Sequence, residues 1–215
     1  MHVNHQKAVL WDMDGVLVDT AEFHFQTWSE VLAELNIPFD REVFTRTFGM
    51  NNRGVLSTLL GHPVEDAYVD EVGGRKEAAF RREIVGRVQL LPGVRHWLER
   101  LQAKGYRQAV ASSAPFENVE ALVDALAIRP FFDALVSAGN MLGKPDPAVF
   151  VEAARRVNVP PENCTVIEDA IAGVEAARRA GMRCLAVTNT NPRQALASAT
   201  WVVDSLEDLP EIFFE

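Results

Sequence analysis

Cysteine, basic residues and long apolar runs are all scarce in this sequence of 215 residues. The only two cysteines, Cys164 and Cys184, each lie inside an apolar run, so we expect two small buried hydrophobic residues rather than a disulfide framework or a metal site. No stretch approaches the roughly 18 consecutive apolar residues that a membrane-spanning helix needs. The opening sequence, MHVNHQKAVLWDMDG, has no apolar segment followed by small residues, as a secretion signal would. These absences predict a cytoplasmic protein with no membrane partner.

Acidic residues outnumber basic ones, 30 to 21, which gives a formal net charge of -9. This balance argues against a protein that binds the phosphate backbone of nucleic acids, so we expect no nucleic-acid partner. Hydrophobic residues make up 48% and charged residues 24%, as in ordinary globular proteins that bury a sizeable core. The length allows one large domain or a core with an insertion. A monomer is the default expectation.

Six short apolar runs, each ending in polar residues, are typical of β-strands that are covered on both faces. They are Lys7–Asp12, Gln108–Ser113, Ala134–Ser137, Thr165–Asp169, Cys184–Thr188 and Trp201–Asp204. Helical spacing of apolar residues separates most of them, for example at Val94, Trp97, Leu98 and Leu101. This alternation predicts an α/β fold with a doubly wound parallel sheet.

The segment from about Thr20 to about Val88 contains helical patterns and no convincing strand. One apolar face includes Phe23 and Trp28, and Pro38 ends that helix. Further helices are expected over Asp40–Phe48, Arg53–Leu60 and Glu65–Val85, the last as one helix or as a pair broken around Gly73 and Gly74. We therefore expect a core of residues 1–19 and 89–215, interrupted by an all-helical insertion of residues 20–88.

Carboxylates, hydroxyls and one lysine stand where the predicted strands end. They are Asp12, Asp14, Ser112, Ser113, Lys144, Glu168 and Asp169. In open α/β sheets the ligand lies beyond the carboxyl ends of the strands, so these side chains are expected to meet there. Asp12 and Asp14 are two residues apart and leave an extended chain on the same face, and Gly15 lets the backbone turn away.

Four carboxylates in one place repel each other unless a cation lies among them. A hard divalent ion, Mg²⁺, suits such oxygen ligands. Lys144 supplies a second positive charge, and Ser112 with neighbouring N–H groups can hold a phosphoryl oxygen. One carboxylate attacking phosphorus and a second carboxylic acid protonating the leaving oxygen make a covalent two-step route.

Each of these residues alone also has a purely structural interpretation. Lys144 can be a solvated loop lysine, Ser112 and Ser113 can cap the helix that begins near Pro115, and Glu168-Asp169 can cap the helix that follows them. Two acids ending one apolar strand have no comparable structural benefit. The ordered set is therefore more specific than any of its members.

The ordered set resembles the haloacid dehalogenase superfamily of phosphotransferases, in its subfamily with an α-helical cap, which includes β-phosphoglucomutases and sugar-phosphate phosphatases. The first motif of that family, DxDGxLxD, appears as Asp12–Asp19. The second is the Ser112 strand end, the third Lys144 in GKPDP, and the fourth Glu168-Asp169 in EDAIAGVEAARRAGM. The resemblance covers essentially the whole chain and implies a Rossmann-like core with an inserted cap.

The resemblance also implies roles for these residues. Asp12 would be the nucleophile that forms an aspartyl phosphate, and Asp14 the general acid and base. Mg²⁺ would be held by Asp12, the backbone carbonyl of Asp14, Glu168 and Asp169, and the phosphate by Ser112, Ser113 and Lys144. Having Asp at position 14 favours phosphoryl transfer over dehalogenation, because an alkoxide leaving group needs an acid.

In the family that the chain resembles, the cap determines substrate specificity. His24 and Trp28 lie one helical turn apart and can line one wall of the site, although Trp28 can equally belong to the core of the cap. Further substrate candidates are Asn52, Arg53 and Lys76, and Thr20 would lie at a hinge. Where the mutases have an arginine that grips a second phosphate, an ungapped match places Asn52, with Arg53 one residue later.

The leading functional prediction is Mg²⁺-dependent hydrolysis of a small phosphorylated metabolite, such as a sugar phosphate, through an aspartyl phosphate. The alternative is a β-phosphoglucomutase-type phosphomutase in which Arg53 replaces the missing arginine. A non-enzymatic phospho-receiver module also combines acidic strand ends, Mg²⁺, a hydroxyl and a lysine, but the large insertion and the D-x-D-G pattern argue against it. A catalytically dead binding protein is disfavoured because all four motif positions are retained.

Overall fold

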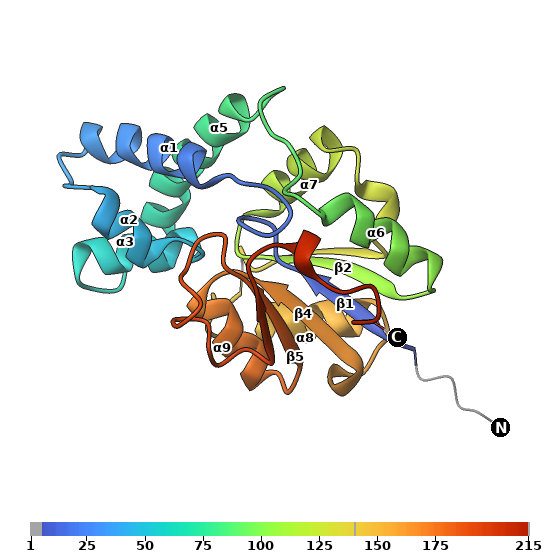
Figure 1. Cartoon of the computed structure of the whole chain (residues 1–215). Helices are drawn as coiled ribbons and strands as arrows, with labels where there is room; N and C mark the ends of the chain where they lie inside the picture. Colours follow the sequence, from blue (N-terminus) through green and yellow to red (C-terminus); the bar gives the residue numbers. More distant parts are fainter. Residues whose placement is uncertain (1–5, 140, 215) are drawn as a thin grey trace.

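A six-stranded, fully parallel sheet forms the centre of the computed structural model, which describes residues 6–139 and 141–214 (Figure 1). The strands lie in the order β3-β2-β1-β4-β5-β6. Their bounds are Ala8–Trp11 (β1), Arg107–Ser112 (β2), Ala134–Ser137 (β3), Cys164–Glu168 (β4), Arg183–Val187 (β5) and Trp201–Val203 (β6). The predicted α/β fold with a doubly wound sheet is confirmed. Residues 1–5, 140 and 215, which the expected core includes, lie outside the described residues.

The central strand β1 alternates its side chains between two hydrophobic layers. Val9 and Trp11 pack with α6 (Val94–Ala103) and α7 (Phe116–Ala125). Ala8 and Leu10 pack on the other face with α8 (Ala148–Arg156) and α9 (Ile171–Arg179). Figure 1 shows these two pairs of helices on opposite sides of the sheet. A strand that is buried on both faces needs no polar face, which explains its continuous apolar sequence.

The topology places a crevice beside β1. The chain runs outward from β1 through β2 to β3, then returns to pair β4 with the other edge of β1. The loops on the two sides of this reversal diverge and leave a crevice between them. In such a sheet the ligand site lies in this crevice, beyond the carboxyl ends of β1 and β4.

The insertion is helical among the residues described. It consists of α1 (Ala21–Glu34), α2 (Arg41–Thr47), α3 (Asn52–Leu60), α4 (Asp66–Tyr68), the π-helical η1 (Val69–Gly73) and α5 (Gly74–Glu83). It has a hydrophobic cluster of its own, which includes Trp28, Leu32, Leu56 and Val72. Figure 1 shows these helices gathered beside the core, at the upper left.

Local side chains set the ends of these helices. Asp40 caps α2 by accepting a hydrogen bond from Val43 N at 2.9 Å, and Asn51 caps α3 through Gly54 N at 2.9 Å. The helical path is continuous from α4 through η1 into α5, so the two glycines do not break it. Gly73 instead leaves room for a neighbour, because an added Cβ would lie 2.8 Å from Asn52 Nδ2.

The two connections between the insertion and the core lie side by side. Val18 forms isolated bridges with Asp14 and with Leu90, and Leu91 N donates to Leu17 O at 3.0 Å.

Both cysteines of the core are buried free thiols, as expected. Within the described part of the chain, every helix is too short or too polar to cross a bilayer.

Candidate active site

A buried lysine joins the ends of β1 and β4. Lys144 Nζ donates to Asp12 Oδ1 and to Glu168 Oε1, each at 2.6 Å. Burial raises the pKa of Asp12 to about 7, even though the attraction of Lys144 opposes this change. Burial would lower the pKa of Lys144, but the two carboxylates outweigh it and hold that pKa above its usual range. The lysine is therefore a fixed positive charge beside the candidate nucleophile.

Asp169 presents a buried oxygen with no protein partner among the described residues, its Oδ1. Its other oxygen, Oδ2, accepts a hydrogen bond from Thr190 Oγ1. Gly15 has a φ of +85° and gives Asp169 its room, because an added Cβ would lie 1.9 Å from Oδ2. Burial, together with repulsion from Glu168 and Asp12, raises the pKa of Asp169 well above its usual range.

These carboxylates fit a magnesium ion. Asp12, Glu168 and Asp169 each offer one oxygen, these atoms lie within 4.8 Å of one another, and all three residues are buried. Mg²⁺ prefers carboxylate oxygens and lowers the free energy of a site where like charges repel. The unpartnered Oδ1 of Asp169 supplies a free ligand atom.

Glu168 is the most fully occupied of the three carboxylates. Its Oε1 accepts from Lys144, and its Oε2 accepts from Asp169 N and Ala170 N, each at 2.8 Å, at the start of α9. Gly173 of α9 lies against it, since an added Cβ would be 1.7 Å from Oε1. Glu168 thus positions Lys144 and the start of α9, in addition to its proposed place near the metal.

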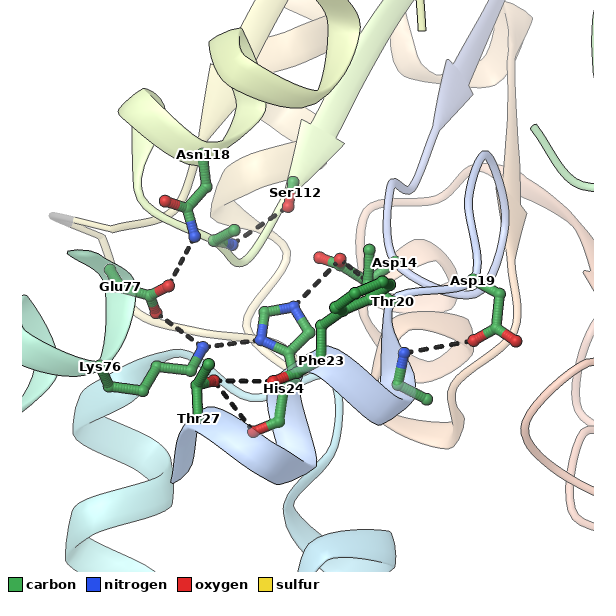
Figure 2. Close-up of polar contacts among 12 residues, drawn as sticks. Asp14, Asp19, Thr20, Phe23, His24, Thr27, Lys76, Glu77, Ser112 and Asn118 are labelled. Atoms are coloured by element: carbon green, nitrogen blue, oxygen red, sulfur yellow. Dashed lines mark hydrogen bonds and ion pairs between the residues drawn. The ribbon is translucent and has the colours of Figure 1, made fainter. Parts of the chain in front are cut away.

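Asp14 points from the core toward the insertion, where Thr20 Oγ1 donates to its Oδ1 and His24 Nε2 lies 3.2 Å from the same atom (Figure 2). Burial would raise the pKa of Asp14, but attraction to His24 and hydrogen bonds from His24 and Thr20 outweigh it, so this pKa lies below its usual range. The His24 ring stacks on Phe80 at 4.1 Å between centroids. Asp14 is therefore held as a carboxylate, the form that accepts a proton.

The polar contacts continue from His24 back to the core, as Figure 2 shows. Lys76 Nζ lies 2.6 Å from His24 Nδ1 and donates to Glu77 Oε1 at 3.0 Å. Glu77 Oε2 accepts from Asn118 Nδ2 at 2.5 Å, and Asn118 belongs to α7 of the core. This line of buried side chains therefore contacts the core at both of its ends, at Asp14 and at Asn118.

A pocket lies between the insertion and the carboxyl ends of the strands. Its walls include Asp14 and Ser113 from the core and His24, Trp28, Asn52 and Lys76 from the insertion. The hydroxyl of Ser113 is buried and has no partner among the described residues, so it is free to bind a ligand. Asp14, the candidate acid, lines this pocket, so the leaving group of a substrate could lie in the pocket beside it.

The structure does not bring every candidate to this pocket. Arg53 Nη1 donates to Val64 O at 2.7 Å and its other guanidinium nitrogen pairs with Asp66, so Arg53 is not among the lining residues. Ser112 lies at the buried end of β2, where its hydroxyl accepts from Ala114 N at 3.1 Å. Trp28 both lines the pocket and belongs to the hydrophobic cluster of the insertion, so its two interpretations hold together.

Some residues around the site are not among those predicted from the sequence. Thr190 and Asn191 hold Asp169, and Asn189 Nδ2 donates to Gly15 O at 2.8 Å. They stand in a polar run directly after β5, so the strand-end rule that found Asp12 could have found them too. Glu77 and Asn118 lie within helices, where a single polar side chain gives no such signal.

Known proteins share this whole architecture. The family model of the haloacid dehalogenase-like hydrolases matches residues 6–181. A β-phosphoglucomutase of Bacillus subtilis (strain 168) is 35% identical over 211 residues, which cover 94% of this chain and 91% of that protein. A phosphorylated carbohydrates phosphatase of Thermotoga maritima is 31% identical over 90% of this chain and 91% of its own length.

A solved structure agrees with them. The crystal structure of a CbbY mutant from Rhodobacter sphaeroides in complex with xylulose-(1,5)bisphosphate superimposes with a TM-score of 0.84 at 28% identity, over 95% of this chain and 96% of that one. Fold, strand-end residues and relatives all agree: this chain belongs to the haloacid dehalogenase-like hydrolases.

Proposed function

We propose that this chain is a Mg²⁺-dependent phosphatase that hydrolyses a small phosphate monoester through a phosphoryl group carried on Asp12. The observation that carries the proposal is the arrangement at the end of β1, where the Asp12 carboxylate lies beside Lys144 and near the unpartnered oxygen of Asp169. The names of the relatives, a phosphomutase and a carbohydrate phosphatase, support phosphoryl transfer and a phosphorylated carbohydrate as substrate.

In the first step, an oxygen of Asp12 attacks phosphorus while the bond from phosphorus to the ester oxygen breaks. Lys144, Ser112 and Ser113 hold the phosphoryl oxygens, and Asp14 gives its proton to the departing alkoxide. The dianionic phosphate raises the pKa of Asp14 when it binds nearby, which favours the protonated form that this step requires.

In the second step, the carboxylate of Asp14 takes a proton from a water molecule, which attacks phosphorus and frees Asp12. The hydrogen bonds from Thr20 and His24 favour this carboxylate form and orient it. Asp12, Glu168, Asp169 and the backbone carbonyl of Asp14 would hold Mg²⁺. When bound, the ion neutralises the charge of the carboxylates and of the phosphate.

The wider organisation is part of the proposal. Residues 20–88 would act as a cap that reads the substrate, with Thr20 near one hinge, and the pocket lining supports this division. We also propose a monomer that works in the cytoplasm on a phosphorylated metabolite. The two buried free thiols are compatible with a reducing compartment.

A phosphomutase is the second candidate function, and the B. subtilis relative favours it. A mutase must hold both phosphates of a bisphosphate intermediate. The contacts of Arg53 with Val64 and Asp66 leave that residue unavailable for such a role, so hydrolysis is preferred.

The test is a phosphate-release assay over a panel of sugar and polyol phosphates, with Mg²⁺ and with EDTA. We expect Mg²⁺-dependent release that EDTA removes and that Asp12→Asn abolishes while the fold is kept. Asp124→Asn, the same change at an exposed carboxylate that pairs with Arg129, is the matched control. Unchanged turnover by Asp12→Asn would overturn the mechanism.

A second assay separates the two functions. The protein is incubated with β-glucose 1-phosphate and a trace of the corresponding bisphosphate, and glucose 6-phosphate and free phosphate are followed together. Formation of the isomer without release of phosphate would reverse the preference for hydrolysis.

A further inference from the structure

The charged side chains on the pocket wall pair with one another. Among the described lining residues these groups are Asp14, Glu77, Lys76 and the ring of His24. Lys76 Nζ lies 2.6 Å from His24 Nδ1 and donates to Glu77 Oε1 at 3.0 Å, so the ammonium group already has two partners within the wall. Among the described lining residues, the one lysine is therefore already paired with a carboxylate.

Glu77 is a fixed part of this wall. The residue is 4% exposed, and both of its oxygens have donors, Lys76 on one and Asn118 on the other. Burial would raise its pKa, but attraction to Lys76 and His24 and the two hydrogen bonds hold that pKa below its usual range. Glu77 is therefore ionised and cannot swing away from Lys76 without losing a contact to the core.

Two arginines of the insertion have partners away from the pocket. Arg53 is held by Val64 O and Asp66, and Arg81 Nη1 donates to Asn118 Oδ1 at 2.7 Å. The remaining wall is mostly apolar, with Trp28 and Phe44 among its members, while Asn52 and Ser113 offer uncharged hydrogen-bonding groups. A second anionic group of a substrate would meet no free cation among the lining residues that the structure describes, whereas a hydroxyl would find partners.

We propose that Glu77 makes this site select phosphate monoesters whose remaining part carries no second anionic group. It does so by neutralising Lys76, which leaves no unpaired cation among the described lining residues. The substrate class is then the monophosphates of neutral sugars and polyols, and bisphosphates and phosphorylated carboxylic acids are excluded. This inference rests on the proposed phosphatase function and narrows it.

The test compares esters of similar size that differ in the charge of the group away from the phosphate. Glucosamine 6-phosphate, glucose 6-phosphate and 6-phosphogluconate form one series, and glycerol 3-phosphate and 3-phosphoglycerate form a second. With Mg²⁺ we expect kcat/KM for the neutral ester to exceed that for the anionic one by about tenfold or more, as expected when an anion is desolvated without a partner. The amino sugar should be accepted at least as well as the neutral one.

Two variants assign this selectivity to the wall charge. Glu77→Gln removes the charge at nearly constant shape and should lower the neutral-to-anionic ratio about tenfold, mainly through KM for the anionic ester. Asn52→Lys adds a cation to the pocket without touching Glu77 and should change the ratio in the same direction. Asn52→Gln is its uncharged control and should keep the ratio of the unmodified protein.

The outcomes are distinguishable. Equal kcat/KM for neutral and anionic esters, or a ratio that Glu77→Gln leaves unchanged, would overturn the role of Glu77 while leaving the phosphatase intact. If Glu77→Gln fails to fold, the ratio of the unmodified protein still tests the selectivity, and Asn52→Lys against Asn52→Gln tests whether the charge of the wall sets it. Failure to hydrolyse any ester with Mg²⁺, p-nitrophenyl phosphate included, would overturn the proposed function itself.

Discussion

Lys144 donates to Asp12 from a position 132 residues further along the chain, and the Nζ to Oδ1 distance is 2.6 Å. The same ammonium group binds Glu168 at 2.6 Å. One buried lysine therefore compensates two buried carboxylates, and a third, Asp169, lies next to them. The stability of this part of the molecule and its chemistry depend on the same charge.

Removing that charge should destabilise the metal-free protein. Lys144→Met leaves buried carboxylates without a cation, and breaking such a pair lowers the free energy of unfolding by about 3–5 kcal/mol. Arg178→Ala, which removes an exposed pair with Glu175, should lower it by about 1 kcal/mol or less. Urea denaturation in EDTA measures both. Equal effects of the two substitutions would show that the Lys144 cluster is not stabilising.

The raised pKa values predict how Mg²⁺ and pH act together. The pKa of Asp12 is about 7 in the folded protein, above the value near 3.9 of an unfolded chain. The folded state therefore binds this proton more tightly, so its contribution to stability is present at low pH and is lost as the pH rises through about 7. The proposed Mg²⁺ would bind the deprotonated form, which would reverse the dependence.

We therefore expect Mg²⁺ to raise the unfolding temperature more at about pH 8 than at about pH 5. Thermal unfolding with EDTA and with saturating Mg²⁺ at both pH values measures the difference. Asp169→Asn, which removes a proposed ligand, should abolish most of it. A Mg²⁺ effect that is larger at the acidic pH would contradict the assignment of these carboxylates to the metal.

Gly15 should prove indispensable because of the space it leaves. Gly15→Ala places a Cβ 1.9 Å from Asp169 Oδ2 and should lower Mg²⁺ affinity more than about tenfold. Gly61→Ala is a matched control, since Gly61 also has a positive φ, of +73°, but an added Cβ would meet nothing within 4 Å. Both variants carry the backbone strain of about 1–2 kcal/mol. Calorimetric titration with Mg²⁺ separates them, and similar affinities for the two would disprove the steric argument.

Asp14 should matter differently for different leaving groups. Nitrophenolate leaves without a proton, so Asp14→Asn should still transfer the phosphoryl group of p-nitrophenyl phosphate to Asp12 but should hydrolyse the acyl phosphate slowly. We expect a burst of about one nitrophenolate per enzyme, followed by turnover slowed roughly 10²–10⁴-fold. Stopped-flow absorbance measures the burst. Steady-state turnover equal to that of the unmodified protein would exclude Asp14 as the base.

The sequence predicts the core of this molecule well because one rule links local pattern to position. Apolar strands that end in Asp12, Ser112 and Glu168 must bring those ends together once the sheet is parallel. The same rule extends to Thr190, which follows β5 and donates a hydrogen bond to Asp169. Strand ends are thus a reliable guide in this fold, and the family resemblance adds chemical roles to them.

The insertion is harder to predict because its side chains meet through helix packing that no spacing encodes. His24 and Lys76 belong to α1 and α5, and their contact depends on how these two helices lie on each other. Arg53 stands beside Asn52 in the sequence, yet its guanidinium turns to Val64 O and Asp66. One step of 100° around a helix separates a wall residue from a surface residue, and only tertiary structure decides which is which.

The central position of β1 also affects how the protein is made. β1 leaves the ribosome early, but both of its neighbours in the sheet come much later; Trp11 and its partner Gln108 on β2 are 97 residues apart. At about 5–20 residues per second, this strand waits roughly 5–20 s for its first neighbour. The helices of the insertion have their own hydrophobic cluster, between Trp28 and Val72, and it is synthesised during that wait. The nascent chain can therefore close the insertion while the apolar strand β1 is still unpaired, which leaves β1 open to misassembly during synthesis.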